Sequence, residues 1–105
     1  MTHQELLARY RHLTGTVLPR LAQANARKWP VHADHCFQRI VLDTVCGGVW
    51  YDHLARPAYR HLTHAQAAQA VALSEALVEG RADVHALNQA SLAYRAEARR
   101  QARLL

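Results

Sequence analysis

The residues best suited to chemistry lie between Val31 and Leu54, a stretch that holds both cysteines, three histidines and three aspartates. Within it, His35, Arg39 and Asp43 are spaced four residues apart, so on a helix their side chains lie along one face. Charged groups held in a core are costly unless they are paired. We therefore interpret this stripe as one side of a polar pocket for a small or anionic ligand, completed by Trp50, Tyr51, Asp52 or His53. The alternative is an Arg39–Asp43 ion pair that fixes how the following turn docks.

A metal site is a second hypothesis for the same stretch. Imidazole and thiolate groups are suitable zinc ligands, and seven such residues occur in this region: His32, His35, Cys36, Cys46, His53, His61 and His64. Their spacing does not favour a zinc site, because there is no Cys-x-x-Cys and neighbouring helical residues point about 100° apart. Cys36 could be a reactive thiol near a helix N-terminus, but a core position is the preferred interpretation. We predict no metal ligand and no cofactor.

A central helix must position the polar stripe. Asp34 is a suitable N-cap for a helix over residues 35–46, and Gly47-Gly48 is a suitable end. Apolar side chains cover most of its circumference, which is typical of a helix in the middle of a domain. They are Cys36, Phe37, Ile40, Val41, Leu42, Val45 and Cys46.

The chain before this helix is amphipathic. Thr2 and Glu5 form a capping box, which predicts a helix that begins at about His3. Because the apolar stripe continues through Pro19, we expect one kinked helix that ends at Arg27-Lys28-Trp29-Pro30. Its inner face is predicted to be Leu6, Tyr10, Leu13, Val17, Leu21 and Ala24.

Two more helices follow, after short turns near residues 49–55 and 58–62. Thr63 and Gln66 form a second capping box, and the helix that they begin should run to Glu79 and stop at Gly80. Its predicted inner face is Ala67, Ala70, Val71, Ser74, Leu77 and Val78. Asp83 should cap a last helix, whose predicted inner face is Val84, Leu87, Ala90 and Tyr94, with a solvated end beyond Arg95.

Composition agrees with this helical pattern. The 105 residues suffice for one domain, half of them are apolar, and no run alternates as a β-strand would. We predict a single all-α domain over residues 1–105, a compact bundle of four main helices around helix 35–46.

Charge and cysteine content suggest the surroundings of the protein. Thirteen basic and eight acidic residues give a formal net charge of +5, which favours anionic partners. Cys36 and Cys46 would lie roughly 15 Å apart along one helix, too far for a disulfide. Reduced thiols, no apolar leader and no apolar run of about 18 residues predict a cytoplasmic protein outside the membrane.

The last two helices, joined at Gly80–Asp83, suggest a nucleic-acid-binding regulator as an alternative function. In a helix-turn-helix the second helix would present side chains able to read base edges, here His85, Asn88, Gln89 and Arg95. An antiparallel helical hairpin of any function has the same sequence pattern.

About 30 residues also resemble a group of small bacterial proteins often labelled GNAT-family N-acetyltransferases. Their order is His-Cys-Phe-x-Arg-Ile-x-Leu-Asp-Asn, Trp-Tyr-x-His-Leu, then Pro-Ala-Tyr; here the corresponding runs are 35–43, 50–54 and 57–62, within a segment of about 30 residues, with Thr44 in place of the asparagine. The label implies an N-acetyltransferase, and a metal-dependent enzyme is the other enzymatic alternative. The acetyltransferase fold has a mixed sheet and an Arg/Gln-x-x-Gly-x-Gly/Ala loop, neither of which this sequence shows. The resemblance therefore implies a domain that accompanies acetyltransferases, and no acetyl-CoA or catalytic residue is carried over.

The most direct functional prediction is a small binding or regulatory protein with a polar pocket. Its ligand-binding residues are predicted to be His35, Arg39, Asp43, Trp50, Tyr51 and His53, and its partner a small or anionic ligand or a protein.

Overall fold

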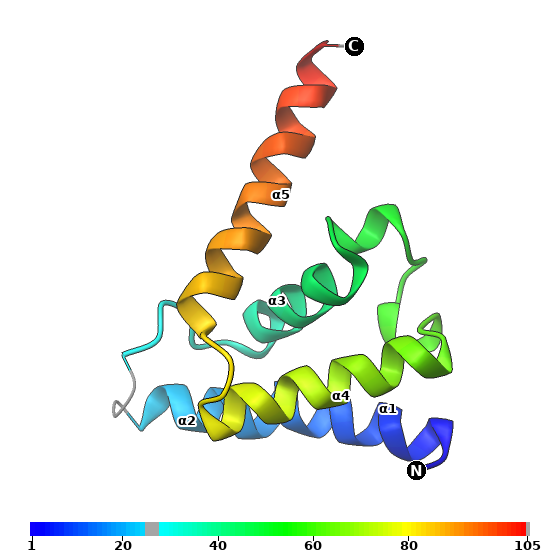
Figure 1. Ribbon diagram of the computed structural model, residues 1–105, viewed down its shortest axis with the longest axis vertical. Coiled ribbons are helices and arrows are strands. Elements are labelled where there is room, and N and C mark those ends of the chain that lie inside the picture. The colour runs from blue at the N-terminus through cyan, green and yellow to red at the C-terminus, as the bar shows by residue number, and fades with distance from the viewer. Residues whose placement is uncertain (25–27, 105) are drawn as a thin grey trace.

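The computed structural model describes residues 1–24 and 28–104, and in these ranges the chain forms an all-helical bundle without strands (Figure 1). The N-terminal helix consists of α1 (His3–His12), η1 (Leu13–Val17) and α2 (Leu18–Gln23). It is followed by α3 (Asp34–Cys46), α4 (His64–Glu79) and α5 (Val84–Leu104), with the 3₁₀ turns η2 (Trp50–Asp52) and η3 (Ala58–Arg60) between α3 and α4. The predicted all-α bundle of four main helices is confirmed.

The N-terminal helix begins at His3, as its capping box predicts. The hydroxyl of Thr2 accepts a hydrogen bond from the Glu5 amide, and the Glu5 carboxylate accepts one from the Thr2 amide, both at 3.1 Å. The helix ends at Gln23, earlier than the predicted end at Arg27–Pro30. Arg27 itself lies outside the described residues.

The helix continues through Pro19 by means of a π-helical turn, η1, in which the Leu18 amide bonds to the Leu13 carbonyl. Such a turn holds one residue more than an α-helical turn and is a common way to insert a proline. The extra residue rotates the rest of the helix about its own axis. The buried positions after Leu13 and Thr14 are therefore Leu18 and Ala22, and the predicted Val17 and Leu21 are only half-buried.

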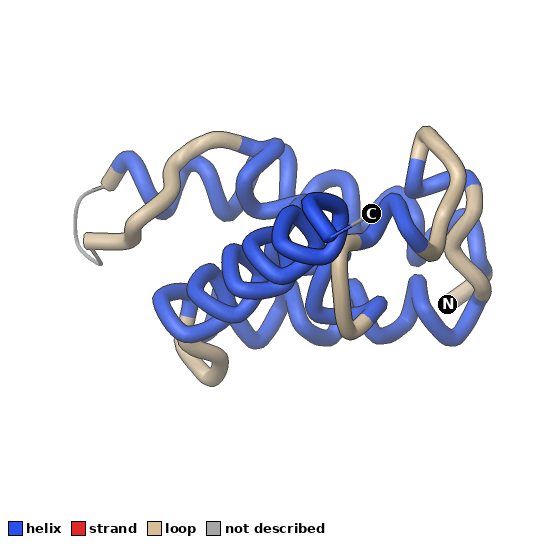
Figure 2. The backbone as a smooth tube through the Cα atoms, turned by 90° about the horizontal axis from the view of Figure 1, so that it is seen from above, coloured by secondary structure: helices blue, strands red, loops and turns tan. Residues whose placement is uncertain are grey.

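The central helix α3 lies between α5 on one side and the α1–α4 layer on the other (Figures 1 and 2). It begins one residue before the predicted start, with Ala33 at the N-cap position, and it ends at Gly47 in the left-handed conformation with φ 68°. The Asp34 carboxylate accepts a hydrogen bond from the adjacent His35 amide at 2.7 Å and does not cap the helix. Most of the predicted core positions of α3 are buried, namely Phe37, Ile40, Val41 and Leu42.

Helix α4 packs along α1 (Figure 1). Its capping box is present, since the Thr63 hydroxyl accepts from the Gln66 amide and the Gln66 side chain accepts from the Thr63 amide. The predicted end at Gly80 is also confirmed, with φ 77°. Five of its six predicted inner positions are buried: Ala67, Ala70, Val71, Ser74 and Leu77. The small alanines among them allow the two helices to approach closely.

Helix α5 begins at Val84, and the Asp83 carboxylate caps it by accepting from the His85 amide at 2.9 Å. Its buried face consists of Val84, Asn88 and Ser91, whereas Ala90 and Tyr94, predicted to face inward, are exposed. The helix continues to Leu104, and its second half projects away from the bundle with mostly exposed residues beyond Arg95 (Figure 1).

Candidate ligand-binding cleft

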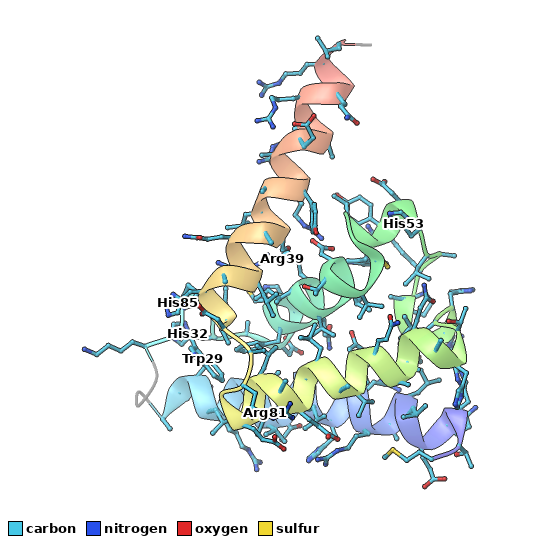
Figure 3. All side chains as sticks on the ribbon, viewed as in Figure 1. Trp29, His32, Arg39, His53, Arg81 and His85 are labelled. Atoms are coloured by element: carbon cyan, nitrogen blue, oxygen red, sulfur yellow. The ribbon has the colours of Figure 1, made fainter. Side chains whose placement is uncertain are left out.

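The predicted polar stripe on α3 runs from solvent into the core. His35 is exposed near the start of the helix, Arg39 is half-buried one turn later, and Asp43 is fully buried one turn after that. This gradient arises because α5 crosses over α3 at the level of the last two residues (Figure 3). The three side chains therefore share a helix face, as predicted, but they occupy very different environments.

Asp43 is surrounded by hydrogen-bond donors from two other elements. Its carboxylate accepts from the Ser91 hydroxyl at 2.6 Å, from Arg95 Nε at 3.0 Å and Nη2 at 3.2 Å, and from the Trp50 amide at 3.0 Å. Charge-assisted bonds of this kind compensate a buried carboxylate for its lost hydration. Asp43 thus holds both α5 and the η2 turn against the central helix.

Arg39 does not pair directly with Asp43, which corrects the alternative interpretation of the stripe as an Arg39–Asp43 ion pair. The guanidinium of Arg39 donates instead to the Ser91 hydroxyl at 2.8 Å and to the Asn88 side-chain oxygen at 2.7 Å. The ion pair of Asp43 is formed with Arg95. Ser91 lies between the two charged groups, because its hydroxyl accepts from Arg39 and donates to Asp43.

Sequence reasoning missed this role of α5, because it assigned the inner face of that helix to Ala90 and Tyr94. The signal was present in the spacing: Asn88, Ser91 and Arg95 follow Val84 at intervals of four, three and four residues. A search for polar partners of Asp43 at helical spacing would have found them. Asn88 and Arg95, also considered as base-reading residues, are engaged with Arg39 and Asp43 and do not point away from the bundle as a recognition face would require.

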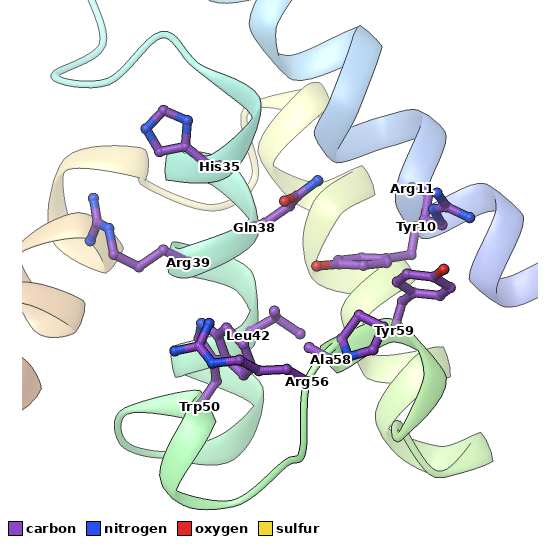
Figure 4. A pocket seen from close by; sticks show the side chains of 11 residues that line it. Tyr10, Arg11, His35, Gln38, Arg39, Leu42, Trp50, Arg56, Ala58 and Tyr59 are labelled. Carbon is purple, nitrogen blue, oxygen red and sulfur yellow. The ribbon is translucent and has the colours of Figure 1, made fainter.

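A cleft of about 670 Å³ opens beside the stripe (Figure 4). Figure 4 shows side chains of α3, including His35 and Arg39, on one side and Tyr10, Arg11 and Tyr59 on the other. Its lining residues are Tyr10, Arg11, His35, Gln38, Arg39, Leu42, Trp50, Arg56, Pro57, Ala58 and Tyr59. This volume suits a small molecule.

The cleft is cationic and aromatic. Arg11, Arg39 and Arg56 line it, and none of the described residues that line it carries a carboxylate. Two of these guanidinium groups lie over aromatic rings: Arg11 is 4.2 Å from the centre of the Tyr59 ring, and Arg56 is 5.0 Å from that of Trp50. Such a lining can hold an anionic group and a flat ring in one ligand.

The structure distributes the six predicted site residues over three places. His35, Arg39 and Trp50 line the cleft. Asp43 is buried behind it and acts through Ser91, Arg95 and the Trp50 amide. Tyr51 is exposed outside the lining and lies against Arg56, and His53 is exposed at the end of the η2 turn (Figure 3). Sequence reasoning did not identify Arg11, Arg56 and Tyr59, because they approach the cleft from elements without a polar stripe.

Within the described ranges, no group of three or more His, Cys, Asp or Glu side chains is arranged to hold a metal ion. Both cysteines are free thiols, and each is only partly buried, so the core position predicted for Cys36 is not observed. Burial and, to a smaller degree, the nearby Asp43 carboxylate raise the pKa of the Cys46 thiol. Burial likewise raises the pKa of the Tyr10 phenol well above its usual range, against a smaller opposing effect of Thr14.

Comparison with known proteins found no matching protein family, no matching curated protein and no matching solved structure. None of the described helices combines the length and the apolar character needed to cross a lipid bilayer. Functional inference therefore depends on the geometry of the cleft.

Proposed function

We propose that this protein is a small binding or regulatory domain whose cleft takes an anionic ligand that carries a planar ring. The observation that supports the proposal is the lining of the cleft, where Arg11, Arg39 and Arg56 approach one space together with aromatic rings and without a carboxylate. Guanidinium groups bind carboxylate and phosphate oxygens in a planar, two-point geometry, and they stack on rings. The same lining therefore suits both parts of such a ligand.

The proposal includes a cytoplasmic location and an association with acetyltransferases. The first is supported by the two free thiols, which are typical of a reducing compartment. The second rests on the sequence resemblance over residues 35–43, 50–54 and 57–62, and these segments supply Arg39, Trp50 and Tyr59 to the cleft. Incubation with acetyl-CoA and a purified acetyltransferase domain, followed by size-exclusion chromatography, would test that association.

The ligand proposal is tested by nuclear magnetic resonance with phenyl phosphate as the probe. The protein contains two tryptophans, so their indole N–H signals report separately on the cleft (Trp50) and on the core (Trp29). We expect phenyl phosphate to shift the Trp50 signal and to leave the Trp29 signal in place. Inorganic phosphate, which lacks the ring, should bind about two- to tenfold more weakly, since an aromatic contact contributes about 0.5–1.5 kcal/mol beyond burial.

Arg56→Ala should weaken phenyl phosphate binding by about tenfold or more, because it removes a charge-assisted contact at the cleft. Arg20→Ala is the matched control: Arg20 is exposed on α2, outside the cleft, and its loss changes the net charge equally. An equal loss of affinity in both variants would show attraction to the overall charge and would overturn the proposed cleft.

A further inference from the structure

The cleft belongs to a larger surface in which arginines and aromatic rings alternate. Arg56 lies over both Trp50 and Tyr51, at 5.0 Å from each ring centre. Across the cleft, Tyr59 is contacted by Arg11 at 4.2 Å and by Arg60 at 5.7 Å. We call these six residues the arginine–aromatic surface: Arg11, Trp50, Tyr51, Arg56, Tyr59 and Arg60.

This surface has unneutralised charge and one exposed ring, that of Tyr51. In the part of the chain that the structure describes, Arg11, Arg56 and Arg60 form no ion pair with a carboxylate. The Tyr51 side chain is 45% exposed, although it is large and mainly apolar. Three arginines close together without a carboxylate give this surface a positive potential that attracts anions.

The positive charge extends beyond the cleft along α5. Arg95 connects the two regions, since its guanidinium lies 5.3 Å from the centre of the Tyr51 ring. Arg99 and Arg103 follow at intervals of four residues and are exposed. Each interval advances the helix by about 6 Å, so Arg99 and Arg103 lie on the projecting half of α5. The single carboxylate in this half, Glu97, is engaged by Arg100 and Gln101.

We infer that the arginine–aromatic surface, together with Arg99 and Arg103 on α5, binds single-stranded nucleic acid. Bases stack on exposed rings and guanidinium planes, and arginines contact the phosphates between them. A polymer that repeats a base and a phosphate would contact two features that a single small anion would not reach. They are the second set of ring contacts, at Tyr59, and the charge on the second half of α5. A single strand suits the surface better than a duplex, because its bases are free to leave the stack. This inference rests on the proposed function and specifies its ligand.

The test is fluorescence anisotropy with labelled twelve-nucleotide oligouridine, oligothymidine and a DNA duplex, together with uridine monophosphate as a competitor. We expect both single strands to bind more tightly than the duplex, with an affinity that falls steeply as salt is raised. Arg99→Ala/Arg103→Ala should weaken oligonucleotide binding by at least about fivefold while leaving phenyl phosphate binding unchanged, because these arginines lie outside the cleft. Tyr51→Ala should also weaken oligonucleotide binding about fivefold or more through loss of stacking.

Arg20→Ala/Arg81→Ala is the matched control, because both residues are exposed and lie outside the arginine–aromatic surface and outside the second half of α5. It should keep at least half of the affinity of the unaltered protein. The inference is overturned if a polyglutamate peptide of equal charge binds as tightly as the oligonucleotides, which would indicate an acidic protein partner. It is also overturned if uridine monophosphate binds and the oligonucleotides bind no better, or if phenyl phosphate binds and no oligonucleotide does. In these last two cases the proposed function is retained. The proposed function itself is overturned if phenyl phosphate does not bind.

Discussion

Asp43 is the residue on which the arrangement of the polar groups depends. It is fully buried, and its four hydrogen bonds come from a serine hydroxyl, an arginine and the amide that begins η2. Three of these bonds join α3 to α5, and the fourth joins it to η2. Through Ser91, Asp43 also fixes the position of the Arg39 guanidinium against α5, at the edge of the cleft.

Asp43→Asn should lower the free energy of unfolding by about 3 kcal/mol, because it leaves the guanidinium of Arg95 without its charge partner in a largely buried site. Urea denaturation would measure the change. Asp52→Asn, at an exposed position in the same region, is the control and should change stability by less than about 0.5 kcal/mol. A loss below about 1 kcal/mol in Asp43→Asn would contradict the role assigned to Asp43.

Cys46 gives a prediction about pH. Burial and the Asp43 carboxylate raise the pKa of its thiol, so the folded state disfavours the thiolate. The associated stability is present below the pKa of the unfolded thiol and is lost as pH rises through the higher folded value. In a Cys36→Ser background, the rate of alkylation by iodoacetamide should rise with pH, and the midpoint of this rise should lie above pH 9.0, the ordinary pKa of a thiol. A midpoint at or below that pH would contradict the prediction.

At the scale of elements, α5 is attached to the bundle by its first half only. Its buried residues are Val84, Asn88 and Ser91, and Arg95 is the last side chain in the polar network. Beyond it, the contacts are exposed pairs within the helix, such as Glu97 with Arg100, and exposed pairs contribute little to stability. The second half of α5 is therefore free to serve as a binding element.

Removal of residues 99–105 should consequently change the free energy of unfolding by less than about 0.5 kcal/mol, while it abolishes the contribution of Arg99 and Arg103 to oligonucleotide binding. Thermal and urea unfolding of the shortened protein would measure the first effect. Ser91→Val is the contrasting variant, since it removes the hydroxyl between Arg39 and Asp43 and should cost about 2 kcal/mol or more. Equal stability loss in both variants would mean that the end of α5 packs against the bundle.

Local sequence signals predicted the elements well and their relative rotation poorly. Capping boxes and glycine helix ends depend only on residues that are close together in the sequence. The predicted helix starts at Thr2 and Thr63 and the predicted ends at Gly47 and Gly80 are therefore observed. The inner face of α5 was assigned from apolar residues, and the buried polar network on α3 overrode it, so that Ser91 faces inward and Tyr94 outward. For the cleft, the α3 stripe was visible in the sequence. The opposite side was not, because Arg11 and Tyr59 are brought there by tertiary packing alone.

At the scale of the whole molecule, the bundle is flat and extended, with dimensions of 42 × 33 × 19 Å. The layer of α1 and α4 supports α3, and α3 alone makes extensive contact with α5 (Figure 2). Because the molecule is thin in one direction, a single partner can contact both the cleft and the arginines on α5. This arrangement explains how a domain of 105 residues offers a binding surface longer than its own core.

The π-helical turn before Pro19 has a consequence for how firmly the sequence specifies one structure. In an uninterrupted α-helix the apolar residues Val17 and Leu21 would face the core, whereas the extra residue of the turn directs Leu18 and Ala22 inward. Either of two apolar faces of this segment could turn toward the core. A proline lacks an amide hydrogen and clashes with the preceding helical turn, so Pro19 disfavours the uninterrupted α-helix and with it the first of these faces. Pro19 therefore helps to specify which face of this helix turns toward the core, and so it acts against an alternative packing of the segment.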